Sequence, residues 1–215
     1  YNIELNGDLK NVSSHLPSPL AKPAGEPLPV NVKVDGNLNS FELTGQAGAD
    51  NHFNSRWLLG QKLTLDRAIW AADSKTLPPL PEQSGVELNM PPMNGAEWLA
   101  LFQKGAAESV GGAASFPQHI TLRTPMLSLG NQQWNNLSIV SQPTANGTLV
   151  EAQGREINAT LAMRNNAPWL ANIKYLYYNP SVAKTRGDST PSSPFPTTER
   201  INFRGWPDAQ IRCTE

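Results

Sequence analysis

Short stretches in which apolar and polar residues alternate run along most of this chain. In residues 28–35, leucine and valine occupy one parity, and asparagine, lysine and aspartate occupy the other apart from Pro29. Because successive side chains of a β-strand point to opposite faces, each such run predicts a strand with one apolar and one polar face. The apolar positions of the runs are Tyr1, Ile3, Leu5, Leu28, Val30, Val32, Val34, Leu63, Leu65, Val86, Leu88, Met90, Ile120, Leu122, Leu137, Ile139, Ile157, Ala159, Leu161, Met163, Ile201 and Phe203.

Turn and loop signals separate these strands. Asn6-Gly7-Asp8, Asp35-Gly36-Asn37 and Asn146-Gly147 place residues that tolerate positive φ between strand candidates, which predicts hairpins and an antiparallel meander. Longer loops are predicted where proline, glycine, alanine and serine accumulate, in residues 16–29, 77–81, 105–117 and 179–198. The same alternation resumes on both sides of each loop, so we expect one domain.

Two segments depart from the strand pattern. In residues 94–103, Asn94 and Glu97 approximate a capping box, and Trp98, Leu99, Leu101 and Phe102 form an apolar stripe. This segment predicts a short helix that packs on the apolar face of the sheet as a plug. Residues 168–176 are a second helix candidate because Pro168 suits a first helical turn, although Tyr175, Tyr177 and Tyr178 suit a strand equally well.

Composition narrows the classes of function. The 215 residues carry 17 basic and 18 acidic side chains, a net charge of -1, so no strong field recruits nucleic acid or an anionic membrane. The single cysteine, Cys213, cannot form an internal disulfide, and zinc sites of the Cys₄ or Cys₂His₂ type are excluded. No apolar run reaches the roughly 20 residues that span a bilayer. Because the chain starts at Tyr1 without methionine, we expect an internal piece of a longer protein.

The sequence contains no recognisable catalytic or cofactor motif. His15, His52 and His119 lie far apart and outside the spacings of metal ligands, and carboxylates such as Asp66 and Asp208 are scattered. No Gly-x-Ser-x-Gly elbow and no phosphate-binding glycine loop is present. A site that the fold assembles from distant residues is left open. We expect a protein that is not an enzyme and that needs no metal or other cofactor.

Six tryptophans are the strongest candidates for binding by composition, namely Trp57, Trp70, Trp98, Trp134, Trp169 and Trp206. Exposed tryptophans could stack on sugars, whereas tryptophans on the apolar parity would line a core or a lipid channel. Packing in a core is the default expectation for most of them.

Three segments resemble one known family. Residues 86–103 (VELNMPPMNGAEWLALFQ), 165–180 (NNAPWLANIKYLYYNP) and 201–213 (INFRGWPDAQIRC) are similar to the YhdP branch of the AsmA-like proteins of Gram-negative bacteria. The resemblance extends over the whole chain. It implies an elongated, curled β-sheet with an apolar groove, in the group of bridge-like lipid-transfer proteins. It also implies a periplasmic segment of a larger groove domain, in a protein anchored to the inner membrane.

On this interpretation the chain carries phospholipid between the inner and outer membranes without chemistry and supports the outer-membrane permeability barrier. Its partners are phospholipid acyl chains and, through parts outside the chain, the two membranes. A carbohydrate-binding β-sandwich and a structural periplasmic spacer stay open as alternatives, because both use the same alternation. The candidates for the groove lining are the apolar strand positions Val30, Val32, Val34, Leu63, Leu65, Leu88, Ile120, Leu122, Leu137, Ile139, Ile157 and Leu161.

Overall fold

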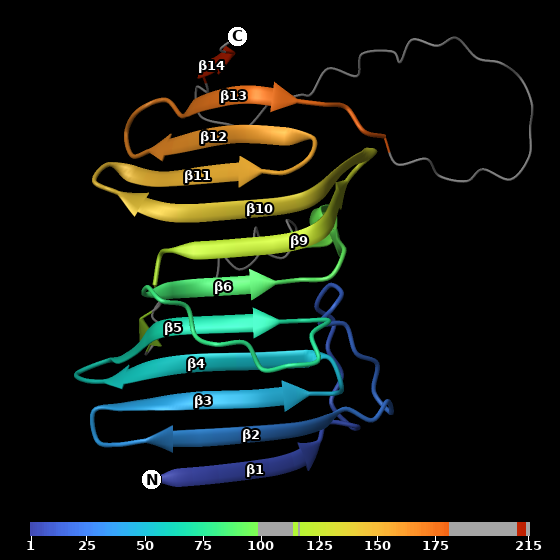
Figure 1. Cartoon of the computed structure of the whole chain (residues 1–215), viewed down its shortest axis with the longest axis vertical. Coiled ribbons are helices and arrows are strands. Elements are labelled where there is room, and N and C mark those ends of the chain that lie inside the picture. Colours follow the sequence, from blue (N-terminus) through green and yellow to red (C-terminus); the bar gives the residue numbers. More distant parts are fainter. Residues whose placement is uncertain (99–113, 116, 181–209, 214–215) are drawn as a thin grey trace, which may run out of the picture.

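The computed structural model is built around one open, curled β-sheet (Figure 1). It describes residues 1–98, 114–115, 117–180 and 210–213. The sheet order is β1-β2-β3-β4-β5-β6-β9-β10-β11-β12-β13-β14, with β7 beside β9 and β8 beside β5. The strands are β1 (Asn2–Asp8), β2 (Pro29–Gly36), β3 (Ser40–Ala47), β4 (Asn51–Leu59), β5 (Leu63–Ala71), β6 (Gly85–Asn89), β7 (Met93–Asn94), β8 (Ala114–Ser115), β9 (Ile120–Leu129), β10 (Gln132–Thr144), β11 (Gly147–Gln153), β12 (Ile157–Arg164), β13 (Leu170–Leu176) and β14 (Gln210–Cys213).

The strand pairing is antiparallel from β1 to β5 and from β9 to β13, and it is parallel in the middle of the sheet and at its C-terminal end. β5, β6 and β9 run parallel to one another, as do β13 and β14, so the expected antiparallel meander is wrong at these places. The reason is the length of the connections. Residues 72–84 and 90–119 are long enough to return to the end of the sheet at which the previous strand began, which a tight hairpin cannot do.

The turn signals were partly correct. Asn146-Gly147 closes the β10–β11 hairpin, in which Gly147 has a φ of 146°. At the β2–β3 hairpin, Asn37 Oδ1 accepts hydrogen bonds from the backbone N–H groups of Asn39 and Ser40. Asn6-Gly7-Asp8 is not a turn, because it forms the second half of β1 and pairs along β2. Exposed backbone in an edge strand accommodates a glycine that would favour a turn elsewhere.

The two helix predictions had different outcomes. Residues 95–98 are helical, and Asn94 caps them as expected, since its Oδ1 accepts from Ala96 N at 3.1 Å and its Nδ2 donates to Glu97 Oε1 at 2.9 Å. Leu99, Leu101 and Phe102 lie outside the described residues. The second helix candidate is wrong, because its residues form β13. There the alternation and the aromatic residues override the proline signal.

The sheet is a single layer in the part of the chain that the structure describes. All of its strands belong to one sheet, and strands in substantial contact are hydrogen-bonded neighbours. No described side chain of any size is less than 2% exposed. The alternative of a β-sandwich requires a second sheet over the apolar face, and the described strands supply none.

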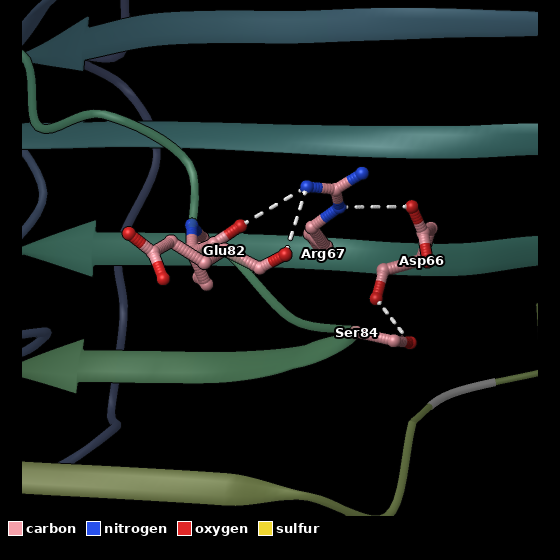
Figure 2. Close-up of polar contacts among 5 residues, drawn as sticks. Asp66, Arg67, Glu82 and Ser84 are labelled. Atoms are coloured by element: carbon pink, nitrogen blue, oxygen red, sulfur yellow. Dashed lines mark hydrogen bonds and ion pairs between the residues drawn. The ribbon is translucent and has the colours of Figure 1, made fainter.

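Two irregular segments pass over opposite faces of this layer. Residues 9–28, called the strap from here on, leave the end of β1 and climb along the ends of the neighbouring strands before they return to β2 (Figure 1). Residues 77–84 cross the other face, where Arg67 Nη1 donates to the carbonyl oxygens of Pro81 and Glu82 at 3.2 and 3.3 Å (Figure 2). Arg67 also pairs with Asp66 at 3.1 Å, and the Ser84 hydroxyl donates to the Asp66 carbonyl at 2.8 Å.

Candidate functional site: a continuous apolar face

Cross-strand partners in register share one face of a sheet, so the pairing of the strands shows which side chains lie in a row. One row, called the central ladder, runs without interruption through eleven strands from β1 to β13. All of its members are apolar or glycine. They are Leu5, Val32, Gly45, Phe53, Trp70, Leu88, Leu122, Ile139, Ala152, Ala159 and Ile173.

A second ladder runs beside the central one on the same face. Only two serines interrupt its apolar character. Its members are Ile3, Val34, Leu43, Ser55, Ala68, Val86, Ile120, Ser141, Val150, Leu161 and Ala171. Strands lie about 4.8 Å apart, so eleven of them make a two-residue-wide apolar track about 48 Å long.

The ladder between these two rows points to the opposite face and is mostly polar. Its members are Glu4, Lys33, Thr44, Asn54, Ile69, Glu87, Thr121, Val140, Glu151, Thr160 and Asn172. Opposite charges face each other on neighbouring strands, with Glu4 3.8 Å from Lys33 and Glu87 2.9 Å from Arg123. The hydrogen bond from Asn31 and the charge of Lys33 lower the pKa of Glu4. One face of the layer is therefore polar and the other is apolar.

A β-bulge preserves the apolar face where the sequence parity changes. Between β4 and β5 the register passes from Arg56 opposite Arg67 to Trp57 opposite Leu65, which leaves Asp66 as the extra residue. Leu65 and Ala68 then lie on the same face although they are three positions apart. Without this bulge, one half of β5 would present the wrong parity to the track.

The strand register places every groove candidate of the described strands on the apolar face. Val32, Leu88, Leu122 and Ile139 belong to the central ladder, and Val34, Ile120 and Leu161 belong to the second ladder. The other candidates lie on the same parity beside them, with pairs Val30–Ala47, Leu63–Leu59, Leu65–Trp57, Leu137–Thr124 and Ile157–Leu176. Whether these residues contact lipid stays a prediction.

Sequence reasoning missed several members of the track. The alternating runs did not include β3, β4, β11 or β13, and so they omitted Leu43, Phe53, Val150 and Ile173. Small or polar residues such as Gly45 and Ser55 conceal the parity of β3 and β4. These strands are identified by the neighbouring strands with which they pair, and this pairing is known only from the structure.

Several aromatic residues lie on the part of the apolar face that β3, β4 and β5 form. Phe41 and Trp57 stack with their ring centroids 6.2 Å apart and an interplanar angle of 8°. Trp70 follows Phe53 in the central ladder, and a Cβ on Gly45 would lie 2.6 Å from Cε2 of Phe53. The missing side chain of Gly45 therefore makes room for the Phe53 ring to lie flat against the sheet.

The described start of the 94–103 segment lies on the same face. Ala72, Met90 and Met93 form a small buried cluster, and Trp98 packs against it together with Trp70, Leu88, Leu122 and Leu127. Trp98 is partly buried, and its indole N–H donates to the Ser18 carbonyl of the strap at 3.0 Å. The plug interpretation therefore has Trp98 in place, while its other three residues are not described.

The described residues offer little for chemistry. They contain no group of three or more His, Cys, Asp or Glu side chains that could hold a metal ion, and none of their helices is long and apolar enough to cross a membrane. The buried carboxylate of Glu156 has structural partners, Asn135 N at 2.6 Å, Asn135 Nδ2 at 2.8 Å and Asn179 Nδ2 at 3.2 Å. The continuous apolar face is thus the candidate site.

The sequence of the chain was compared with known protein families and solved structures. The family model described as YhdP protein covers residues 1–215, and no solved structure matches the chain. The family is one of bridge-like lipid transfer in the Gram-negative envelope, and it is not known for catalysis. Since the match includes every strand of both ladders, the chain belongs to the YhdP family.

Proposed function

We propose that the apolar face is a path along which phospholipid acyl chains move between the inner and outer membranes. The chain forms one segment of a larger periplasmic groove domain, anchored to the inner membrane through parts outside it, and contributes to the outer-membrane permeability barrier. The observation that carries this proposal is the continuity of the central ladder. Its apolar character persists through eleven strands, while the row beside it on the opposite face is mostly polar.

The path needs no chemical step. Each CH₂ group that leaves water for an apolar surface contributes about 0.8 kcal/mol, so a lipid chain stays bound wherever the track is apolar. Neighbouring strands offer similar side chains about 4.8 Å apart, so that a shift by one strand costs little net burial. At about 48 Å, the track exceeds the hydrocarbon thickness of a bilayer, about 30 Å, which favours passage along a surface over storage of a single lipid.

Photo-crosslinking tests the proposal by parity. A crosslinking amino acid in the full-length protein in cells at Val32, Leu65, Leu122 or Leu161 should capture phospholipid, because these positions share the apolar face. The matched controls are the neighbours Lys33, Thr64, Thr121 and Thr160, whose side chains point to the opposite face. We expect at least tenfold less lipid adduct at the controls, measured by mass spectrometry of the purified protein.

Two outcomes would contradict the proposal. Absence of adducts at both parities would favour a structural spacer, and equal labelling of both parities would show that lipid contact does not follow the apolar face.

A further inference from the structure

A cavity separates the strap from the apolar face. Its volume is about 520 Å³, within the range of about 300–1,000 Å³ that single small ligands occupy in proteins. Most of its lining is apolar. The apolar side chains include Pro19, Leu20 and Leu28 from the strap and Ala47, Phe53 and Trp70 from the sheet. Since Phe53 and Trp70 are consecutive members of the central ladder, the cavity opens on the track itself.

The polar lining of the cavity disfavours an anionic head group. Of its three polar side chains, Lys22, Glu26 and Asn51, only Lys22 carries positive charge. The ammonium group of Lys22 has three donors, and it contacts three backbone carbonyl oxygens of the strap, those of Val12 at 2.7 Å, Pro23 at 3.2 Å and Lys10 at 3.5 Å. The Glu26 carboxylate and the Asn51 side-chain oxygen, which is buried without a protein partner, are both acceptors. A phosphate would therefore meet the negative charge of Glu26, while the one cation of the lining already contacts three carbonyl oxygens.

The strap maintains its own shape. Ser14 and Lys22 exchange backbone hydrogen bonds of 2.8 and 3.0 Å, and Leu9 N donates to Leu28 O at 2.9 Å where the two ends of the strap meet. Leu28 N donates to the Asp8 carboxylate at 2.8 Å, and the Trp98 indole holds the far end through Ser18. Most strap residues are exposed, so internal bonds rather than burial in a core define the roof of the cavity.

From these contacts we infer that the strap and strands β3–β5 form a binding site for one hydrocarbon chain of a lipid, whose head group stays outside the cavity. This inference rests on the proposed function, because a chain that follows the central ladder passes Phe53 and Trp70 and would enter the space beneath the strap. It adds one enclosed binding site to the track. This site encloses a chain on two sides, between the sheet and the strap.

The test compares two positions of the strap in the full-length protein in cells. A crosslinking amino acid at Leu20, which lines the cavity, should capture phospholipid at least tenfold more than one at Val12, which belongs to the same strap but is 51% exposed and does not line the cavity. Leu161, on the second ladder in β12, reports the track independently of the strap.

The pattern of labelling separates the site from the proposed function. Adducts at Leu161 with equal, low yields at Leu20 and Val12 would overturn the chain site and leave the track in place. Adducts at Leu20 without any at Leu161 would support the site and contradict transport along the track. Absence of adducts at both Leu20 and Leu161 would overturn both.

A second measurement avoids any substitution. Purified full-length protein is mixed with phosphatidylcholine vesicles that contain a phospholipid with a diazirine either at the end of one acyl chain or in the head group. The chain-end probe should label peptides covering residues 17–28, and the head-group probe should label them at least tenfold less. Stronger labelling by the head-group probe would overturn the assignment of a chain to this cavity.

Discussion

At the scale of single residues, the apolar face depends on small side chains as much as on large ones. Gly45 is buried beneath the Phe53 ring, and Ala152 and Ala159 continue the central ladder with small side chains. The parity of the large residues could be predicted from the sequence. The role of Gly45 could not, because it depends on the side chain of a residue eight positions away on the neighbouring strand.

Replacement of Gly45 by alanine tests this close contact. The new Cβ would lie 2.8 Å from Cε1 of Phe53, so the ring must move away from the sheet. We expect a loss of about 1–3 kcal/mol in the free energy of unfolding, typical of overpacking. Gly7→Ala in β1 is the matched control, because a Cβ at Gly7 meets nothing within 4 Å. Denaturation midpoints measure both, and equal midpoints would contradict the proposed contact between Gly45 and Phe53.

At the scale of elements, the sequence predicted strands well where one face alternates without interruption and failed where connections decide the outcome. The run at Ile157–Met163 is β12, as expected. The parallel arrangement of β5, β6 and β9 goes with long connections between these strands, residues 72–84 and 90–119, and no local pattern of the sequence predicts which strands such connections bring together. The predicted turn at Asn6-Gly7-Asp8 became strand because β2 offers a partner along its whole length. Tertiary pairing overrode local propensity in each case.

A polar clasp joins strands that are not neighbours. Glu156, in the β11–β12 turn, bonds Asn135 of β10 and Asn179 beyond β13, and Asn179 O accepts from Gln133 N of β10 at 3.0 Å. The segment after β13 thus returns to the start of β10 (Figure 1). These hydrogen bonds hold the segment after β13 against the start of β10, and they thereby fix the position of β11 and β12 between these two strands. The sequence offered no sign of this clasp, because Glu156 and its partners are polar residues at strand ends.

The clasp makes stability depend on pH. Burial raises the pKa of Glu156, but the hydrogen bonds from Asn135 outweigh it, so the pKa is lower than the ordinary 4.5. The ionised form therefore stabilises the fold above pH 4.5, and this contribution disappears as the pH falls through the lowered pKa. Glu156→Gln should cost about 2 kcal/mol at neutral pH, the range for hydrogen bonds to a charged group. It should also flatten the loss of stability in acid.

The control for this prediction is Glu151→Gln, which neutralises an exposed carboxylate on the polar face of β11. Denaturation at several pH values between about 3 and 7 compares the two variants with the natural protein across the range in which glutamate titrates. If the curve of stability against pH for Glu156→Gln runs parallel to that of Glu151→Gln, the buried carboxylate is not the group that makes the clasp sensitive to acid.

At the scale of the whole molecule, the single layer predicts that a substitution on the apolar face can impair lipid passage without unfolding the protein. In a sandwich, the apolar face is the core, and a charge on it unfolds the protein. Here the described sheet has no second layer, and Leu161 is only partly buried on the second ladder. A charged side chain at this position can reach water when no lipid occupies the track. The same charge opposes a lipid chain that must cross it, because a desolvated, unpaired carboxylate costs several kcal/mol.

Leu161→Asp should therefore leave the protein folded and interrupt lipid passage. We expect an unchanged far-ultraviolet circular dichroism spectrum and a loss of at least tenfold in phospholipid captured by a crosslinker at Leu122, six strands from β1 on the same track. Cells that depend on the variant should show a leakier outer membrane, measured by uptake of a large antibiotic. Thr160→Asp is the matched control, because it places the same charge one residue away on the polar face. An unfolded Leu161→Asp protein would show that the apolar face is covered as a core, and equal transport by both variants would show that lipid does not follow the ladders.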